Sequence, residues 1–221
     1  MFKKLAGLTV LAGLFIAGTA GAAVTGSSHD LSAEIASLDD VCSICHAPHS
    51  NVNNPADGML WNHIDGTITS YAVYSSLTME APGGQPGPTS LLCLSCHDGS
   101  VAVDSFGIKG TARTGTLFID NAAFTQAGGL NQMGAALSDD HPIGMTYNVA
   151  DGELNATTTG LSFNDGATSG TVADLLFGAG TVECASCHDV HNTQSSAGAN
   201  GEGLLRVSNA GSGLCTTCHA K

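Results

Sequence analysis

Apolar residues are concentrated in a few short stretches of this chain, and long polar segments rich in glycine and threonine separate them. The first stretch, Leu5–Ala17, follows two lysines and precedes the small residues Ala20-Gly21-Ala22. A charged start, a short apolar run and small residues at a cleavage point are typical of a secretion signal. The run is too short and too rich in glycine to favour a membrane-spanning helix. We therefore predict that residues 1–22 are removed on export and that 23–221 form one soluble domain with no membrane span.

The remaining hydrophobic patterns predict only short elements. In 31–38 the apolar residues recur every three or four positions, which favours two helical turns. The segments Tyr71–Tyr74 and Thr116–Asp120 favour short strands, and Asn164-Asp165-Gly166 has the composition of a tight turn. We expect mostly irregular coil, with short helical turns and a few short strands.

Composition argues against an ordinary apolar core. Of the 221 residues, 29 are glycine, while only 5% are aromatic and 11% charged. Such a chain has little large apolar volume to bury and loses much backbone freedom on folding. A bulky apolar group other than side chains would resolve this conflict.

One signature, Cys-x-x-Cys-His, occurs four times and contains every cysteine of the chain. It is the attachment site of c-type haem, in which both thiols bond to the porphyrin and the histidine supplies the proximal iron ligand. Zinc sites or disulfides are the alternative, but neither requires a histidine after the second cysteine each time. We predict a small multihaem cytochrome with the haem stack as its core and four covalently bound haem c groups. Motifs 1 to 4 attach them through Cys42 and Cys45, Cys93 and Cys96, Cys184 and Cys187, and Cys215 and Cys218, with His46, His97, His188 and His219 as proximal ligands.

Five further histidines are candidates for the distal iron ligands. His49 and His191 each follow a proximal histidine by three residues, so on one helical turn both side chains point the same way. They cannot bind opposite faces of one haem, and each must ligate the haem of another motif. The ligand candidates, in order, are His49, His191, His141 and His29, with His63 beside Trp61 as the fifth candidate and the predicted spare; Met59, Met79, Met133 and Met145 are the alternatives.

The order of these features repeats along the chain. A histidine, a Cys-x-x-Cys-His-x-x-His motif and a simple motif follow one another in about 29–138 and again in about 139–221. We interpret this as a pseudo-repeat within one domain, because stacked haems would cross any boundary between the halves.

The charge of the chain is strongly acidic. The formal net charge is −13, and four basic residues remain against 19 acidic ones once the signal is removed. Nucleic acid is therefore excluded as a partner, since its binding requires clustered Lys and Arg. The acidity serves solubility or attracts a positively charged partner.

The chain resembles secreted tetrahaem cytochromes with paired haem motifs, and in particular the OmcE-like cytochromes that polymerise into extracellular nanowires. The resemblance rests on CSICHAPHS, LWNH, Tyr71-x-x-Tyr74 and LLCLSCHDGSVAVDSFG in the first half, and on DHPIGMTY, VECASCHDVHNT and GLCTTCHAK in the second. It implies low-spin haems with two histidine ligands, stacked in a continuous line. It also implies that one distal histidine crosses the subunit interface, and the position of the candidates favours His49 first and His29 second.

These observations lead to one preferred function and two alternatives. The preferred function is extracellular electron transfer by a head-to-tail homopolymeric filament, secreted or at the cell surface, that delivers electrons to redox partner proteins or extracellular acceptors. A monomeric periplasmic electron carrier is the alternative. A multihaem reductase is disfavoured because it needs an open iron and a positive pocket, so we predict an electron-transfer protein and not an enzyme.

Overall fold

The structure is a computed structural model that describes residues 24–35, 40–47, 60–81, 83–107, 114–120, 133–191, 193 and 204–220. The predicted signal peptide, His49 and Met59 lie outside the described residues. Within them the chain is mostly irregular, and its regular elements are short. In chain order these are β1 (Ala72–Val73), α1 (Pro88–His97), β2 (Ala136–Leu137), β3 (Met145–Thr146), β4 (Gly160–Ser162), β5 (Ser169–Thr171), a 3-10 helix (Val172–Leu175), β6 (Thr181–Val182), α2 (Cys184–Cys187), a second 3-10 helix (Ala210–Ser212) and α3 (Gly213–Cys218).

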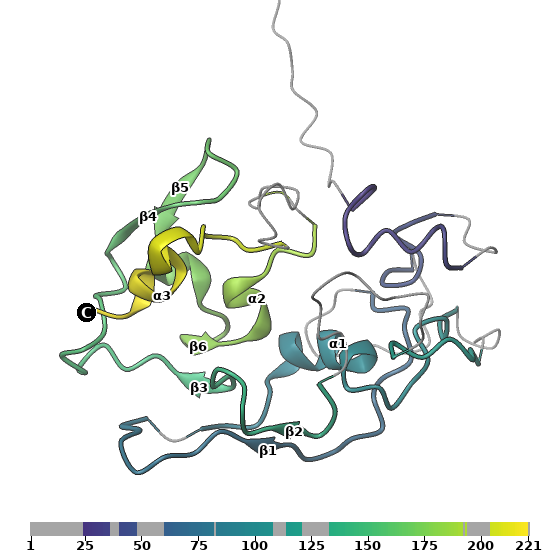
Figure 1. The fold of residues 1–221 in the computed structure, drawn as a ribbon, viewed down its shortest axis with the longest axis horizontal. Helices are drawn as coiled ribbons and strands as arrows, with labels where there is room; N and C mark the ends of the chain where they lie inside the picture. Colours follow the sequence, from purple (N-terminus) through teal and green to yellow (C-terminus); the bar gives the residue numbers. More distant parts are fainter. Residues whose placement is uncertain are drawn as a thin grey trace, which may run out of the picture.

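The strands form three separate two-stranded sheets (Figure 1). β1 pairs in parallel with β2, β3 pairs antiparallel with β6, and β4 pairs antiparallel with β5. None of these sheets is large enough to organise a domain, because a two-stranded sheet is at best marginally stable alone.

Two of the sequence predictions for local structure are confirmed. β1 lies within the predicted strand Tyr71–Tyr74. The predicted turn at Asn164-Asp165-Gly166 connects β4 and β5, and Gly166 adopts φ 70°, which glycine tolerates without steric cost.

The predicted strand at Thr116–Asp120 is wrong. Leu117 accepts one backbone bond from Val103 at 2.9 Å, but its own amide donates to the Asp104 carboxylate at 2.8 Å. The Gly115 amide likewise donates to the Ser105 hydroxyl. Side-chain acceptors thus take the place of a second backbone partner, so no ladder forms.

All three α-helices of the described residues contain the two cysteines of a Cys-x-x-Cys-His motif. α1 starts with Pro88, which suits the first helical position because its missing N–H would have no partner there. Leu92 and Leu94 are buried, and motif 2 forms the last turn of this helix. α2 is motif 3 without its histidine, and α3 contains motif 4 up to its second cysteine.

In the described part of the chain, buried apolar side chains form three small clusters rather than one core. The first contains Ile35, Ile44, Val103 and Ile119, and Cys45 and Cys96 pack against it. The second is built on Tyr71, Leu94 and Leu137, and the third on Phe163, Leu175 and Val207.

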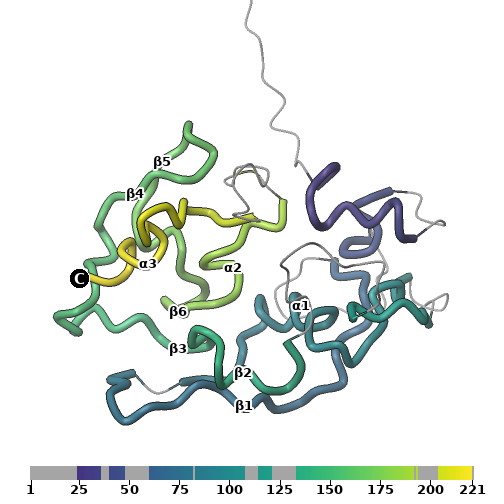
Figure 2. Tube along the Cα trace, viewed as in Figure 1, coloured from purple at the N-terminus to yellow at the C-terminus, as the bar shows by residue number. Residues whose placement is uncertain are grey.

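The two halves of the chain occupy different parts of the molecule and meet at the helices. The first half lies mainly at the right and along the lower edge in Figure 2, and the second half lies at the left. α1 and α2 contact each other across this boundary. Among the described residues, no helix has the length and apolar character needed to cross a membrane.

Candidate functional site

Each Cys-x-x-Cys-His motif places its two cysteines on one helical turn. In motifs 1, 3 and 4 the histidine amide donates to the carbonyl of the first cysteine, at 2.8, 3.1 and 2.9 Å. The backbone is extended at His188 and His219, with ψ 139° and 125°, so each helix ends at the preceding cysteine. Motif 2 differs, because His97 is still part of α1.

Six of the histidine rings form three close pairs. His29 faces His97 with 6.1 Å between ring centroids, His191 faces His46 at 6.0 Å, and His141 faces His219 at 6.4 Å. In every pair one ring belongs to a predicted proximal ligand and the other to a predicted distal ligand. Each pair also joins two different parts of the chain, and His191 faces motif 1 instead of its own motif 3.

The separation within these pairs fits a metal ion between the rings. A first-row metal lies about 2 Å from a ligating imidazole nitrogen, and a ring radius of about 1.1 Å on each side places the centroids about 6 Å apart. The three observed separations match this value. His46 also lies 6.1 Å from the ring of Trp61, so the three pairs are distinguished by both rings being able to ligate a metal, not by the separation alone. The pairs therefore fit axial ligation of three of the four predicted haem irons.

The surroundings of two distal candidates keep the ring nitrogen in the form that binds metal. Nδ1 of His141 lies 3.0 Å from the Pro142 carbonyl oxygen, so Nδ1–H donates and this bond does not use Nε2. This is the usual second partner of a metal-binding histidine. Burial lowers the pKa of His29 to about 4, and the nearby His97 adds to the effect. Nδ1 of His29 is buried without a hydrogen-bond partner.

His63 has a different environment. Its ring is fully buried, with Nδ1 2.7 Å from the Ile64 carbonyl oxygen and Nε2 3.1 Å from that of Ala102. Nε2 also lies 3.4 Å from the sulfur of Cys96. Because both ring nitrogens face protein atoms, this geometry favours the spare role predicted for His63 over iron ligation.

The cysteines place the motifs next to one another in sequence order. Burial raises the pKa of Cys96, and electrostatic interaction with Cys45 of motif 1 adds to the rise. The neighbouring Cys184 of motif 3 raises the pKa of Cys93 in motif 2, and burial adds to the rise. Burial raises the pKa of Cys187 to about 11, with Cys218 of motif 4 contributing next.

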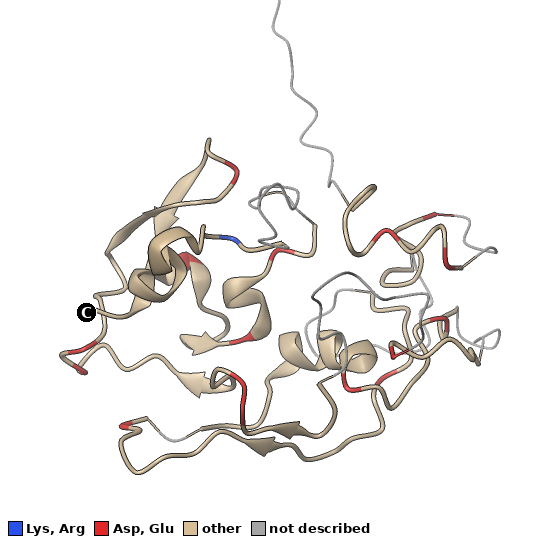
Figure 3. Cartoon of the chain, in the orientation of Figure 1, with Lys and Arg blue, Asp and Glu red and all other residues tan. Residues whose placement is uncertain are grey.

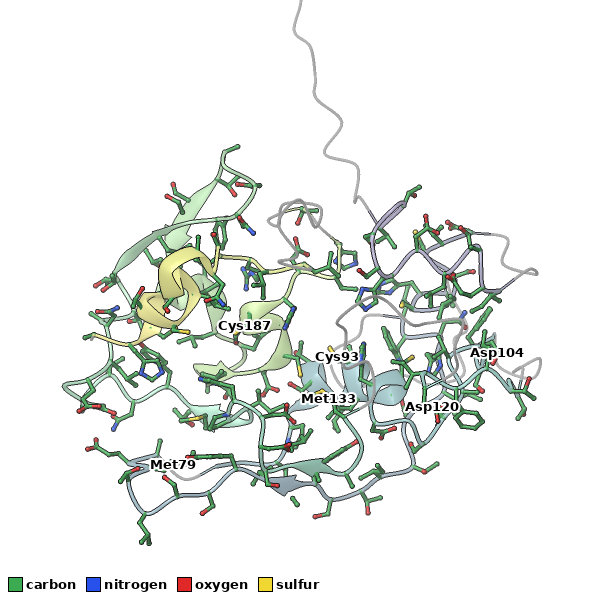
Figure 4. All side chains as sticks on the ribbon, viewed as in Figure 1. Met79, Cys93, Asp104, Asp120, Met133 and Cys187 are labelled. Carbon is green, nitrogen blue, oxygen red and sulfur yellow. The ribbon has the colours of Figure 1, made fainter. Side chains whose placement is uncertain are left out.

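The stick view agrees with this arrangement. Cys93 and Cys187 both lie near the centre of the molecule, where α1 and α2 meet (Figure 4). Met79 lies near the lower edge, far from both, which argues against it as an iron ligand. Met133 lies beside Cys93 in this view, and its amide donates to the His97 carbonyl at 2.7 Å.

A buried acid connects motifs 2 and 3. Glu183 is 4% exposed and accepts hydrogen bonds from the Ser90 hydroxyl and the Gly87 amide, which belong to the first turn of α1 and its N-cap. The Ser90 hydroxyl also accepts from the Cys184 amide at 3.0 Å. Sequence reasoning missed this residue, because a glutamate before a cysteine gives no signal of burial.

The charges of the described residues lie mostly in the irregular segments (Figure 3). Acidic residues are spread over both halves, and Arg206 is the one Lys or Arg in the part of the chain that the structure describes. No disulfide joins any of the eight cysteines, all of which are among the described residues. Within the described ranges, no three His, Cys, Asp or Glu side chains are grouped to hold a bare metal ion.

Comparison with known proteins does not identify this chain. No protein-family model matches it, and no curated protein matches it either.

Proposed function

We propose that this protein transfers electrons through four covalently attached c-type haems, each with two axial histidines. The observation that carries the proposal is the set of three histidine pairs, whose 6.0, 6.1 and 6.4 Å separations suit a metal between the rings. Each haem would supply a one-electron centre, whose potential depends on its ligands, burial and hydrogen bonds.

The order of the cysteines supports a continuous electron route. Cys45 and Cys96 pack against the same apolar cluster, α1 contacts α2, and Cys218 contributes to the electrostatic surroundings of Cys187, so each motif lies near the next. In the proposed protein the chain holds its haems at these positions and thereby sets the distances between them. A route from motif 1 to motif 4 would then run the length of the described molecule.

Three of the four irons have candidate ligands from one chain. They would lie between His46 and His191, His97 and His29, and His219 and His141. Because His29 already lies next to His97 of the same chain, His49 becomes the preferred candidate to ligate the fourth iron together with His188. His49 lies outside the described residues.

In the preferred form of the proposal, His49 comes from a neighbouring subunit. A head-to-tail contact that does not close into a ring produces an open filament. We propose that this filament is extracellular and that it passes electrons to redox proteins or to acceptors outside the cell. The acidic side chains suit a positively charged acceptor or partner.

One observation favours the alternative, a monomeric periplasmic carrier. His191 faces His46, so the two Cys-x-x-Cys-His-x-x-His motifs are opposed within one chain. A reciprocal pairing of His49 with His188 would then complete all four sites without a second subunit.

Electron microscopy and gel filtration of the secreted, haem-loaded protein distinguish these forms. An intact mass with four haems is expected in both cases, and fewer than four would refute the proposal. Filaments in the native protein and monomers in His49→Ala would support the intersubunit ligand. Monomers in both, with one additional high-spin haem in His49→Ala, would support the monomeric carrier. His63→Ala is the matched histidine variant and should not change the assembly state.

A further inference from the structure

A short extended segment lies antiparallel to the end of motif 4. This segment is 153–155, and its middle residue, Leu154, forms a β-bridge with His219. The amide after that histidine donates to the carbonyl of Glu153 at 2.7 Å, and the Asn155 amide donates to the carbonyl of the second cysteine at 2.8 Å. The Asn155 side chain donates to the carbonyls of the two residues between the cysteines, at 2.9 and 3.0 Å.

The same arrangement occurs at motifs 1 and 3, in segments 60–62 and 204–206. Their middle residues, Trp61 and Leu205, form β-bridges with His46 and His188. The amides of Ala47 and Asp189, which follow the histidines, donate to the carbonyls of Leu60 and Leu204 at 2.9 and 2.8 Å. The amides of Asn62 and Arg206 donate to the carbonyls of Cys45 and Cys187 at 2.9 and 2.8 Å. The side chain of that third residue, Asn62 or Arg206, donates to the carbonyl after the first cysteine. We call the three segments the clasps.

The clasps at motifs 1 and 3 share one more feature. Their first residues, Leu60 and Leu204, adopt φ 52° and 58°, a left-handed conformation that is uncommon for leucine. Two segments far apart in sequence thus enter the same arrangement through the same strained backbone conformation. Such strain persists only where the surrounding contacts impose it.

The bonds made by the clasps have a physical reason. The last carbonyls of a helical turn have no partner within the helix and must be satisfied from outside. In motifs 1, 3 and 4 the clasp supplies these donors and holds the backbone of the histidine extended. Motif 2 is arranged differently, because its histidine is the last residue of α1 and the Met133 amide donates to the His97 carbonyl at 2.7 Å.

The three clasps differ in charge at their third position. Asn62 and Asn155 are neutral, whereas Arg206 places its guanidinium 3.2 Å from the Ala185 carbonyl oxygen, inside motif 3. The guanidinium also donates to the Asp174 carbonyl at 2.9 Å and lies 5.3 Å from the ring centroid of Phe163. It is half-buried against motif 3, so water screens its charge only partly.

We propose that the clasps position the proximal histidines of motifs 1, 3 and 4, and that Arg206 also raises the reduction potential of the iron bound by His188. The proposal rests on the haem-binding function proposed above. A fixed positive charge favours the reduced form of a nearby iron, because reduction adds a negative charge. The carboxylates of Asp174 and Asp189 lie near Arg206 as well and offset part of its positive charge, but replacing Arg206 with a neutral residue still makes the surroundings of motif 3 more negative.

The test uses the secreted holoprotein and three substitutions at one position. Arg206→Met removes both the donor and the charge, Arg206→Gln keeps a donor without the charge, and Arg206→Lys keeps the charge. Asp165→Asn, in the exposed turn between β4 and β5, is the control for a general change of net charge. Haem content is measured by mass, and the four potentials are measured by a redox titration followed optically.

The proposal predicts that Arg206→Gln and Arg206→Met lower the potential of one haem in four, whereas Arg206→Lys retains it. Unchanged potentials in both variants would overturn the role of Arg206. So would an equal downward shift of all four potentials that mirrors an equal upward shift of all four in Asp165→Asn. If native protein lacks four haems, the proposed function fails instead, so the two failures are distinguishable.

The positioning role is tested at motif 4, whose clasp residue is neutral. Asn155→Leu should leave four haems attached but convert part of the low-spin signal of one haem to high spin. Asn148→Ala is the matched control, because that side chain only accepts a bond from an exposed amide. Identical spectra for Asn155→Leu, Asn148→Ala and the native protein would refute the positioning role.

Discussion

Replacement of Glu183 by alanine should destabilise the protein by separating motif 2 from motif 3. The carboxylate is buried and accepts from the Ser90 hydroxyl and from the Gly87 amide, the latter at 3.1 Å. Hydrogen bonds to a charged group contribute about 1.5–3 kcal/mol each, so two of them correspond to about 3–6 kcal/mol. Relief of the cost of burying the carboxylate reduces this value, and we expect a loss of about 3 kcal/mol in the free energy of unfolding.

This loss is measured by equilibrium unfolding of the haem-loaded protein in guanidinium chloride, followed by visible absorbance and by circular dichroism. At about 2–4 °C per kcal/mol for a chain of this size, the melting temperature should fall by about 6–12 °C. Glu183→Gln should lose less, because the amide oxygen can still accept both bonds without their charge assistance.

Glu80→Ala is the matched control for this prediction. Glu80 is exposed, so its removal should change the free energy of unfolding by less than about 0.5 kcal/mol. If Glu183→Ala and Glu80→Ala unfold at the same denaturant concentration, Glu183 does not connect the two helices and the reasoning is refuted.

Three further predictions concern a ligand, a close contact and a buried phenol. His141→Ala should give one high-spin haem in four by optical or spin-resonance spectra, whereas His63→Ala should keep all four low-spin; the reverse result would exchange their roles. Gly84→Ala should cost about 1–3 kcal/mol in chemical denaturation, because a Cβ there would meet the backbone of a neighbouring loop, while Gly152→Ala, in open space, should cost far less. Burial raises the pKa of Tyr71, and the hydrogen bond to the Asp98 carboxylate adds to the rise. The stabilisation that the Tyr71 hydroxyl gives the folded protein is therefore complete at a pH below its unfolded pKa of about 10, and it is lost as the pH rises toward the folded pKa. The stability gap between the native protein and Tyr71→Phe should narrow above that pH in urea titrations, and a constant gap would contradict the assignment.

Local features of the fold followed from local sequence. The turn at Asn164-Asp165-Gly166 and the strand β1 within Tyr71–Tyr74 need only neighbouring residues, and both were predictable. The strand predicted at Thr116–Asp120 failed because its partners are the side chains of Asp104 and Ser105, which compete with a backbone ladder. Periodicity does not report such competition.

The sequence alone determined the chemistry that this protein can offer. The spacing of Cys-x-x-Cys-His predicts haem attachment. The His-x-x-His spacing also predicted that His191 faces a motif other than its own, but the helical turn assumed for that argument is absent, because α2 ends at Cys187 and the backbone of His188 is extended.

Only the tertiary structure decided which parts of the chain meet. It pairs His29 with His97 and His141 with His219, and it brings the clasp residues to the ends of their motifs across intervening segments of very different length. It also buries Glu183 between two helices that are distant in sequence. Contacts of this kind depend on how irregular segments pack around one another, and no periodic pattern along the chain encodes that packing.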